Sequence, residues 1–145
     1  INSTVFLVST QFDHIDIQQT YSFDPTINCY PAKLSQVFMN LISNACQAIE
    51  EKLVEKVFTG KIKISSKKEE GNINITICDN GSGMDNDVLE RIFEPFFTTK
   101  SDQGTGLGMS ISQDIILEHQ GELRVSSIPK KGTDVNLLLP LNKQS

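Results

Sequence analysis

Residues 92–110 have the sequence IFEPFFTTKSDQGTGLGMS. This segment joins an aromatic cluster to a polar loop, and the loop leads into Gly104, Gly106 and Gly108 at the predicted start of a helix. Backbone N–H groups at a helix start attract anions, and glycine lets a large anion approach the backbone closely. The segment therefore predicts an anion site, and other parts of the sequence must indicate which anion it binds.

The composition is that of one ordinary globular domain. The chain has 145 residues, of which 38% are hydrophobic, enough to bury a core. We expect a single domain over residues 1–145, with residues 1–12 as a linker remnant and residues 141–145 as a frayed tail. Because the chain begins with Ile1 rather than Met, we expect it to be part of a longer protein.

Charge and cysteine content narrow the class of partner. Thirteen basic residues are scattered among 18 acidic ones, for a net charge of −5, so nucleic acid is a poor partner. The sequence shows neither a membrane-spanning apolar run nor a signal peptide. Three well-separated cysteines, Cys29, Cys46 and Cys78, favour small buried apolar residues over a disulfide framework or a zinc site. We therefore expect a cytoplasmic location and no direct membrane contact.

Hydrophobic periodicity predicts the order strand, long helix, hairpin, short helix, loop, helix, hairpin. This order favours an α+β, two-layer α/β sandwich, with a mixed, mostly antiparallel sheet of about five strands covered on one face by about three helices. The predicted helices span residues 31–56, 85–93 and 108–120, with Gly121 ending the last of them. The predicted strands span residues 15–23, 26–30, 61–67, 73–79, 122–127 and 134–139.

A polar stripe runs along the long predicted helix. Gln36, Asn40, Asn44, Gln47 and Glu51 share one face, although asparagine is a mediocre helix former. One interpretation is a solvated face. The other is that amide oxygens bind a hard cation such as Mg²⁺, which usually brings phosphates with it. An amide cannot take a proton from water, so such a site would hold a nucleotide without hydrolysing it quickly.

A second polar segment, Asp79-Asn-Gly-Ser-Gly83, follows a predicted strand. A plain turn is one interpretation, since Asn-Gly is a strong turn signal, whereas an EF-hand would place Gly81 and Gly83 at ligand positions. A carboxylate is also a good acceptor for an exocyclic amino group such as that of adenine. The glycines would let the backbone pass close to a flat ring.

The glycine-rich segment 104–108 lacks both a preceding strand and a GK[ST] sequence, so it is neither a Rossmann fingerprint nor a Walker loop. We expect it to bind phosphate at a helix start, with Lys100 as a point charge and Thr98 and Thr99 as positioning groups.

The aromatic cluster has two interpretations. Phe93, Phe96 and Phe97 are most simply core residues, or they anchor residues 94–106 as a mobile lid. For His119 at a helix end we expect dipole stabilisation or packing, and His14 has no supporting context.

Together these segments resemble the catalytic ATP-binding domain of sensor histidine kinases, of the Bergerat (GHKL) superfamily, over roughly residues 15–140. The resemblance rests on five motifs in order: QVFMNLISNACQAI like the N box, DNGSGM and GTGLGMSI like the two glycine boxes, IFEPFFTTK like the F box, and GTDVNLLLP like the closing strand.

The resemblance implies that Asn44 ligates Mg²⁺, that Asn40 lies near the phosphates and that Asp79 accepts from the adenine amino group. It also implies that Thr133 supports the adenine through water. Its catalytic residues are Asn40, Asn44 and Lys100. The implied nucleotide-binding set is Asn40, Asn44, Gln47, Asp79, Gly81, Gly83, Met84, Phe93, Thr98, Thr99, Lys100, Gly104, Thr105, Gly106, Leu107, Gly108 and Thr133.

The implied reaction is transfer of the γ-phosphoryl group of Mg-ATP to a histidine on a separate dimerisation domain of the same parent protein, with a response regulator downstream. Hydrolytic relatives carry a glutamate at the position of Asn40, so the amide favours the kinase branch. Many kinases have a basic residue at Gln47 and some have arginine at Thr98, which leaves more phosphate contact to Lys100. Neither His14 nor His119 matches the phosphoacceptor.

We therefore expect a monomeric fragment that binds ATP or ADP and shows little activity alone, from a parent that can be membrane-anchored. The alternatives are a Bergerat-fold serine kinase or ATPase, and a non-catalytic nucleotide-sensing module.

Overall fold

The computed structural model describes residues 15–21, 31–69, 71–94 and 108–140. Within these ranges the predicted order of elements is confirmed, with boundaries shifted by a few residues. The predicted strand 26–30, the predicted linker remnant and tail, and most of the predicted lid lie outside the described residues. The elements are β1 (Asp16–Tyr21), α2 (Pro31–Glu55), β2 (Lys61–Glu69), β3 (Asn72–Asp79), α3 (Asn86–Arg91), α4 (Gly108–Glu118), β4 (Glu122–Ile128) and β5 (Gly132–Pro140).

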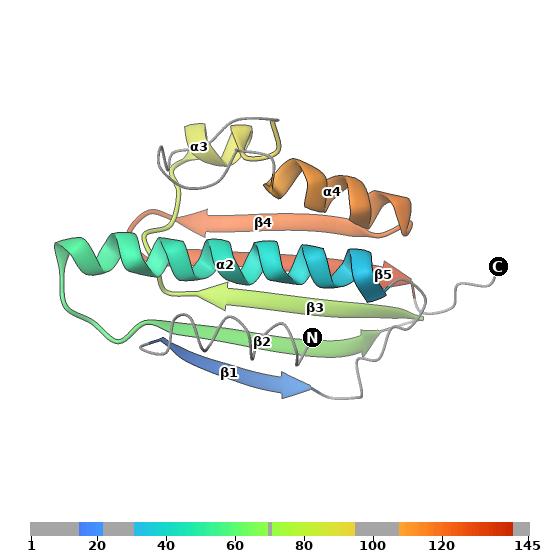
Figure 1. Cartoon of the computed structure of the whole chain (residues 1–145), viewed down its shortest axis with the longest axis horizontal. Helices are drawn as coiled ribbons and strands as arrows, with labels where there is room; N and C mark the ends of the chain where they lie inside the picture. Colours follow the sequence, from blue (N-terminus) through green and yellow to red (C-terminus); the bar gives the residue numbers. More distant parts are fainter. Residues whose placement is uncertain (1–14, 22–30, 70, 95–107, 141–145) are drawn as a thin grey trace.

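One five-stranded sheet, in the order β1-β2-β3-β5-β4, forms the base of the domain (Figure 1). Only β1 and β2 are parallel, and the other neighbours are antiparallel. A parallel pair needs a long crossover, which the connection through α2 provides, whereas the antiparallel pair β2–β3 is joined by a tight turn. The predicted mixed, mostly antiparallel sheet is therefore confirmed.

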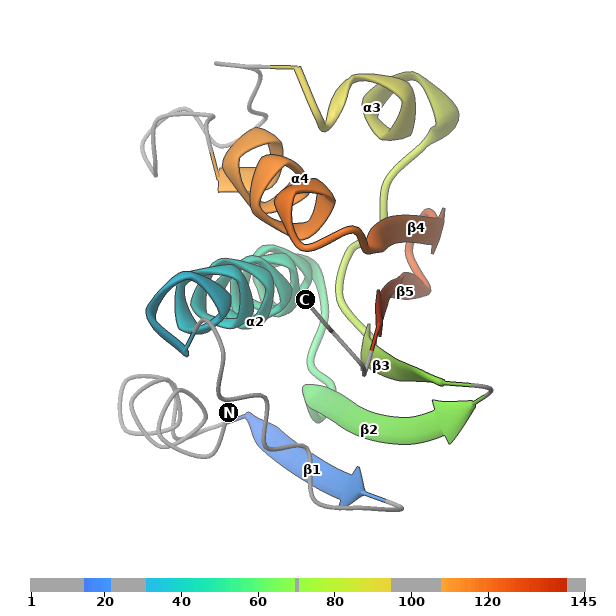
Figure 2. The ribbon, with the colours of Figure 1, turned by 90° about the vertical axis from the view of Figure 1, so that its right-hand side faces the viewer.

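The helices α2 and α4 cover the same face of this sheet (Figure 2). The helix α2 begins at Pro31, whose fixed φ suits a first helical position. Its buried side carries Val37, Leu41, Cys46 and Ile49, each at most 2% exposed. With α2 and α4 on one face of the sheet, the two-layer arrangement is as the sequence predicts.

None of the described helices has the apolar stretch that a bilayer crossing requires.

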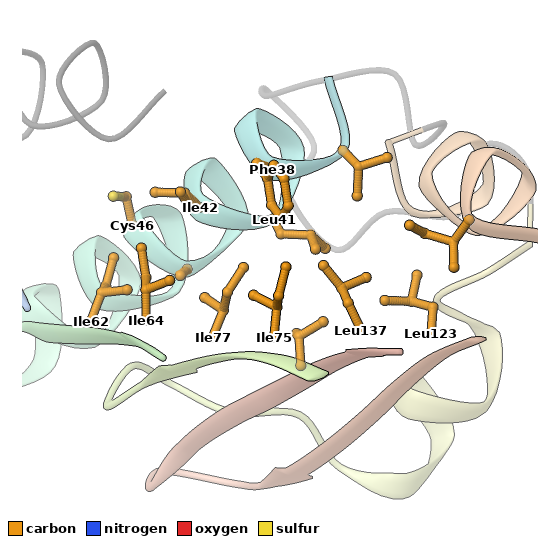
Figure 3. Close-up of a cluster of buried hydrophobic side chains, with 14 of the residues drawn as sticks. Phe38, Leu41, Ile42, Cys46, Ile62, Ile64, Ile75, Ile77, Leu123 and Leu137 are labelled. Carbon is orange, nitrogen blue, oxygen red and sulfur yellow. The ribbon is translucent and has the colours of Figure 1, made fainter. Parts of the chain in front are cut away.

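The core consists of rows of apolar side chains that run across the strands under α2. Along β3, Ile73, Ile75 and Ile77 alternate with half-buried polar residues, so every second side chain points to the helices. Figure 3 shows side chains of α2, among them Phe38 and Leu41, directed toward Ile75 and Ile77. Burial of these side chains is the main favourable contribution to folding.

Each of the two shorter helices has a specific cap at one end. The Asp85 side chain accepts from the Val88 N–H at 3.0 Å and caps α3. At the end of α4, Gln120 rather than Gly121 adopts the left-handed conformation, with φ 63°. The N–H groups of Gln120 and Gly121 donate to Leu117 and Ile116, as in a Schellman motif. Gly121 is required for a different reason, because a Cβ there would collide with the Leu138 carbonyl.

We predict that Leu137→Ala lowers the free energy of unfolding by about 2–5 kcal/mol, since Leu137 is 0% exposed and its truncation leaves a cavity. Urea unfolding followed by far-UV circular dichroism measures the change. Val57→Ala is the control: Val57 is 96% exposed, and its substitution should change stability by less than about 0.5 kcal/mol. Equal losses in the two variants would contradict the assignment of the core.

Candidate functional site

A row of polar side chains replaces the apolar rows at one end of the sheet. In register, Asp79 of β3 lies opposite Thr133 of β5, and Thr133 lies opposite Ser127 of β4. Asp79 and Ser127 follow Ile77 and Val125 by two positions, and Thr133 precedes Val135 by two. All three side chains therefore point to the helix-covered face. The preceding row consists of Ile64, Ile77, Val135 and Val125. The polar row therefore directly continues the core, and Thr133 is only 8% exposed.

The loop from Asp79 to Met84 begins with a local turn and is then attached to α2. The Gly81 N–H donates to Asp79 Oδ1 at 2.8 Å, which is the pattern of an Asx turn. The Ser82 N–H donates to the carbonyl oxygen of Ala48 at 3.1 Å. The Ser82 hydroxyl donates to Glu51 Oε1, also at 3.1 Å. The helix thus holds the loop through one backbone and one side-chain contact.

The turn between β4 and β5 holds the same loop from its other side. The Lys130 N–H donates to the Ser82 carbonyl oxygen at 2.6 Å. The Met84 N–H donates to Ser127 Oγ at 2.8 Å. The loop therefore lies between a helix and a strand connection that are far apart in the sequence, and the backbone groups of Ser82 and Met84 have partners in them.

Both glycines of this loop have a packing requirement within the protein. A Cβ at Gly81 would lie 2.6 Å from the Ala48 carbonyl carbon and 2.8 Å from the Ile49 nitrogen. Gly83 has φ +70°, and a Cβ there would collide with the carbonyl oxygen of Ile128. The sequence interpretation assigned the glycines to close approach of a flat ring. In the structure, the chain itself already requires glycine at both positions.

Asn80 is an anchor that the sequence interpretation missed, because it considered this residue only as part of a turn signal. The Lys61 N–H donates to Asn80 Oδ1 at 2.8 Å, and Asn80 Nδ2 donates to the Thr59 carbonyl at 3.0 Å. Lys52 Nζ donates to the Asn80 carbonyl at 3.0 Å and lies 4.7 Å from the centre of the Phe58 ring. These contacts fix the point where β3 ends and the loop begins.

The polar stripe of α2 faces α4 at the two asparagines. Asn40 Nδ2 donates to Ser112 Oγ at 3.2 Å, and Asn44 Nδ2 donates to Met109 Sδ at 3.3 Å. Both asparagines are half-buried, and Ser112 is 0% exposed. The interpretation of the stripe as a solvated face is therefore wrong for these two residues, although it holds for the exposed Gln36.

The asparagines and the Asp79 loop lie along one stretch of α2. Asn44 precedes Ala48, which holds the loop, by about one helical turn, and Asn40 precedes it by about two turns, or about 12 Å. Ser112 and Met109 complete this stretch from α4, three residues apart and so on one face of that helix. Sequence spacing alone gives no signal that α4 would supply these partners, because they depend on how two helices pack.

The donor set fits a hard cation only together with a ligand that brings oxygens. Among the described residues, no three His, Cys, Asp or Glu side chains form a metal-binding cluster. The Asn44 amide donates to Met109 through its nitrogen, so its oxygen is the atom with lone pairs to offer a cation. Mg²⁺ keeps several waters and takes most other ligands from phosphates, so a single protein oxygen suits it.

Several expected site residues lie outside the described part of the chain. These are Thr98, Thr99, Lys100, Gly104, Thr105, Gly106 and Leu107, together with Phe96, Phe97, His14 and Cys29. Gly108 is the first residue of α4. Gln47 is half-buried on α2, and Phe93 is half-buried and packs against the core. His119 is 7% exposed and its Nδ1 lies 2.7 Å from the Ile115 carbonyl oxygen, which confirms a packing role at the end of α4.

Two free thiols flank the sheet near the polar row. Burial, helped by the negative charges of Glu50 and Asp79, raises the pKa of Cys46 to about 12. Burial and a hydrogen bond with Asp134 raise the pKa of Cys78 to about 12 as well. Cys46 is fully buried, as the sequence predicts, whereas Cys78 is half-buried on the other face of the sheet. Neither thiol is a reactive thiolate at neutral pH.

Comparisons with known proteins show the family to which the chain is similar. The profile of the family described as histidine kinase-, DNA gyrase B-, and HSP90-like ATPase matches residues 29–143. The histidine-protein kinase AtoS of Escherichia coli is 44% identical over 119 residues, which cover 81% of this chain and 18% of AtoS. Sporulation kinase E of Bacillus subtilis is 35% identical over 149 residues, covering the whole chain and 19% of that kinase. The chain thus spans less than a third of the length of these relatives.

Solved structures show the same fold. The catalytic domain of histidine kinase ThkA has a TM-score of 0.76 and 28% identity, covering 97% of this chain and 91% of that domain. Full-length ShkA, solved in complex with AMPPNP, has a TM-score of 0.80 and 24% identity, covering 96% of this chain and 28% of ShkA. The expected α+β sandwich of histidine kinase catalytic domains is confirmed.

We predict that the free energy of unfolding falls as the pH rises from 8 to 11. The folded protein keeps the protons of Cys46 and Cys78 up to about pH 12, whereas the unfolded thiols lose theirs near 9.0, so the unfolded state binds fewer protons in this interval. Urea unfolding at pH 8 and pH 10.5 measures the fall, which should be smaller in the variant with both thiols changed to alanine. The same fall in that variant would contradict the assignment.

Proposed function

We propose a function from the premise that the chain belongs to the family of histidine kinase-, DNA gyrase B- and HSP90-like ATPases and is a histidine kinase catalytic domain. In this proposal it binds Mg-ATP and donates the γ-phosphoryl group to a histidine on another domain. One observation carries the proposal: a polar row that continues the core and ends in a carboxylate adjoins the helix that carries two half-buried asparagines. This arrangement offers separate places for a base and for phosphates.

The base would lie at the Asp79 end. Asp79 Oδ1 already accepts from Gly81, and an ionised carboxylate has lone pairs for further donors, such as an exocyclic amino group. Thr133 is its cross-strand neighbour and adds a hydroxyl on the same face. Since the Asp79–Met84 loop is held on two sides before any ligand arrives, little ordering would be needed on binding.

The phosphates would lie along α2 toward the start of α4. Asn44 would hold Mg²⁺ and Asn40 would lie close to the phosphates, while the N–H groups that follow Gly108 open an eleven-residue helix. A helix N-terminus favours negative charge. Lys100, Thr98, Thr99 and residues 104–107 remain proposed phosphate contacts. When bound, the metal would supply charge neutralisation on the β- and γ-phosphates.

The reaction we propose is transfer rather than hydrolysis. The bond between the γ-phosphorus and its bridging oxygen breaks, a bond from phosphorus to a histidine ring nitrogen forms, and ADP leaves. Asn40 donates to Ser112 and carries an amide, which cannot accept a proton from water as a glutamate would. The acceptor histidine would belong to a dimerisation domain of the parent protein, with a response regulator downstream.

We predict that Asp79→Asn weakens ADP binding about 10- to 100-fold, because a charged acceptor for the amino group is lost. Isothermal titration calorimetry with Mg²⁺ measures this affinity. Asp134→Asn is the matched control, since Asp134 follows Thr133 in the sequence but is exposed on the opposite face. This variant should bind ADP as tightly as the unsubstituted chain. No binding of ADP or ATP by the parent chain would overturn the proposed function.

We predict that Asn44→Asp changes the dependence of nucleotide affinity on Mg²⁺, since a carboxylate binds the cation more strongly but repels phosphate in its absence. Titrations of ADP across a series of Mg²⁺ concentrations test this. Gln36→Glu adds the same charge at an exposed site of α2 and should leave the dependence unchanged. Identical curves for Asn44→Asp and the parent would remove Asn44 from the metal site.

We predict that the isolated chain releases inorganic phosphate from ATP slowly, with no burst, and labels the histidine-bearing domain of its parent when the two are mixed. A coupled phosphate assay and acid-labile radiolabel from γ-labelled ATP measure the two activities. Steady phosphate release that Asn40→Ala abolishes would instead favour the ATPase alternative.

A further inference from the structure

The Ser127 hydroxyl lies at the centre of the polar row and joins three groups. It accepts from the Met84 N–H at 2.8 Å, lies 3.0 Å from the Gly132 carbonyl oxygen, and lies 2.8 Å from Thr133 Oγ1. The four residues belong to the loop after β3, to β4 and to β5. One hydroxyl therefore connects the loop that carries Asp79 with the strand that carries Thr133.

Counting hydrogens fixes the direction of each bond. A serine hydroxyl has one hydrogen and two lone pairs. The Gly132 carbonyl can only accept, so it takes the Ser127 hydrogen, and the Met84 N–H can only donate, so it takes one lone pair. The second lone pair then receives the hydrogen of the Thr133 hydroxyl. All three contacts are satisfied together only in this arrangement.

This arrangement decides what Thr133 can do in a hydrogen bond with a ligand. With its hydrogen directed to Ser127, Thr133 Oγ1 offers only lone pairs to any other group. Its cross-strand neighbour Asp79 is an acceptor as well, and directly opposed residues place their Cβ atoms about 4.5–5.5 Å apart. Two acceptors side by side suit a group with two hydrogens that contacts them directly. An oxo group in the same place would meet lone pairs only.

We propose that Ser127 is a positioning residue that holds Thr133 as an acceptor and so makes this end of the site select a 6-amino purine over a 6-oxo purine. The inference rests on the proposed nucleotide-binding function. Ser127 would act through Thr133 and through the Met84 N–H, with no need to touch the base itself. Without its hydroxyl, Thr133 would be free to rotate and to donate.

Ser126 and Ser127 differ in a way that supports this role. They are consecutive on β4, so their side chains point to opposite faces of the sheet. Ser126 is exposed on the face away from the helices, whereas Ser127 is half-buried on the face that carries Asp79. The chain therefore contains its own matched control for the removal of a serine hydroxyl from this strand.

The experiment compares ADP with inosine 5′-diphosphate, which has an oxo group in place of the amino group, by calorimetric titration with Mg²⁺. Ser127→Ala should lower the affinity for ADP about tenfold, which is about the value of one hydrogen bond. The affinity for inosine diphosphate should stay the same or rise. Ser127→Thr, which keeps the hydroxyl, should restore the preference for ADP over inosine diphosphate. Ser126→Ala should bind both nucleotides as the unsubstituted chain does. An equal loss for both nucleotides in Ser127→Ala would overturn the proposal, because a purely structural role affects them alike.

A double-mutant cycle tests whether Ser127 acts through Thr133. Thr133→Val removes the acceptor and should itself lower the ratio of ADP to inosine diphosphate affinity. Adding Ser127→Ala to Thr133→Val should then lower the affinity for ADP much less than Ser127→Ala does in the unsubstituted chain. Fully additive losses of affinity would overturn the proposal. If Ser127→Ala does not fold, an unchanged ratio in Thr133→Val alone would overturn it. Failure of the parent to bind ADP would be a separate result, against the proposed function itself.

Discussion

The hydrogen bond from the Ser82 N–H to the carbonyl of Ala48 joins the helix layer to the loop that leaves the sheet. It brings the Asp79–Met84 loop against α2 so closely that a side chain at Gly81 would overlap the helix backbone. The β4–β5 turn then closes on the loop from the other side through Lys130 and Ser127. Asp79 itself is paired with Ile62 and Thr133 in the sheet, and the Ser82–Ala48 contact fixes the loop whose Gly81 N–H donates to its carboxylate.

The core and the candidate site are built by the same alternation. Along β3 and β5 every second side chain points to α2, and for most of their length those side chains are apolar. At one end the alternation continues but the chemistry changes, from Ile77 and Val135 to Asp79 and Thr133. A site placed on the last row of a packed core is supported by the apolar row before it. Its polar groups also lie where water is partly excluded, which strengthens their hydrogen bonds.

Periodicity was sufficient to predict the elements from the sequence, because strands and helices here have clear two- and 3.6-residue patterns. The local motifs also led to the correct family. The sequence could not reveal that Asn40 and Asn44 donate to Ser112 and Met109, since this depends on the packing of two helices distant in sequence. Ser127 was missed for a related reason, because its neighbours are set by strand register. Gly121 marks the end of α4, but the left-handed residue is Gln120, and local propensity does not distinguish these roles.

The contacts that form the site join segments far apart along the chain. Asn40 and Ser112 are separated by 72 positions, Asn44 and Met109 by 65, and Met84 and Ser127 by 43. No local fragment, hairpin or isolated helix contains more than a part of it, and forming such non-local contacts carries a cost in loop-closure entropy. A ligand that fills the site therefore binds only the complete fold, and its binding energy adds to the stability of the whole domain. Occupancy by ligand would thus slow local opening in the sheet and both covering helices together.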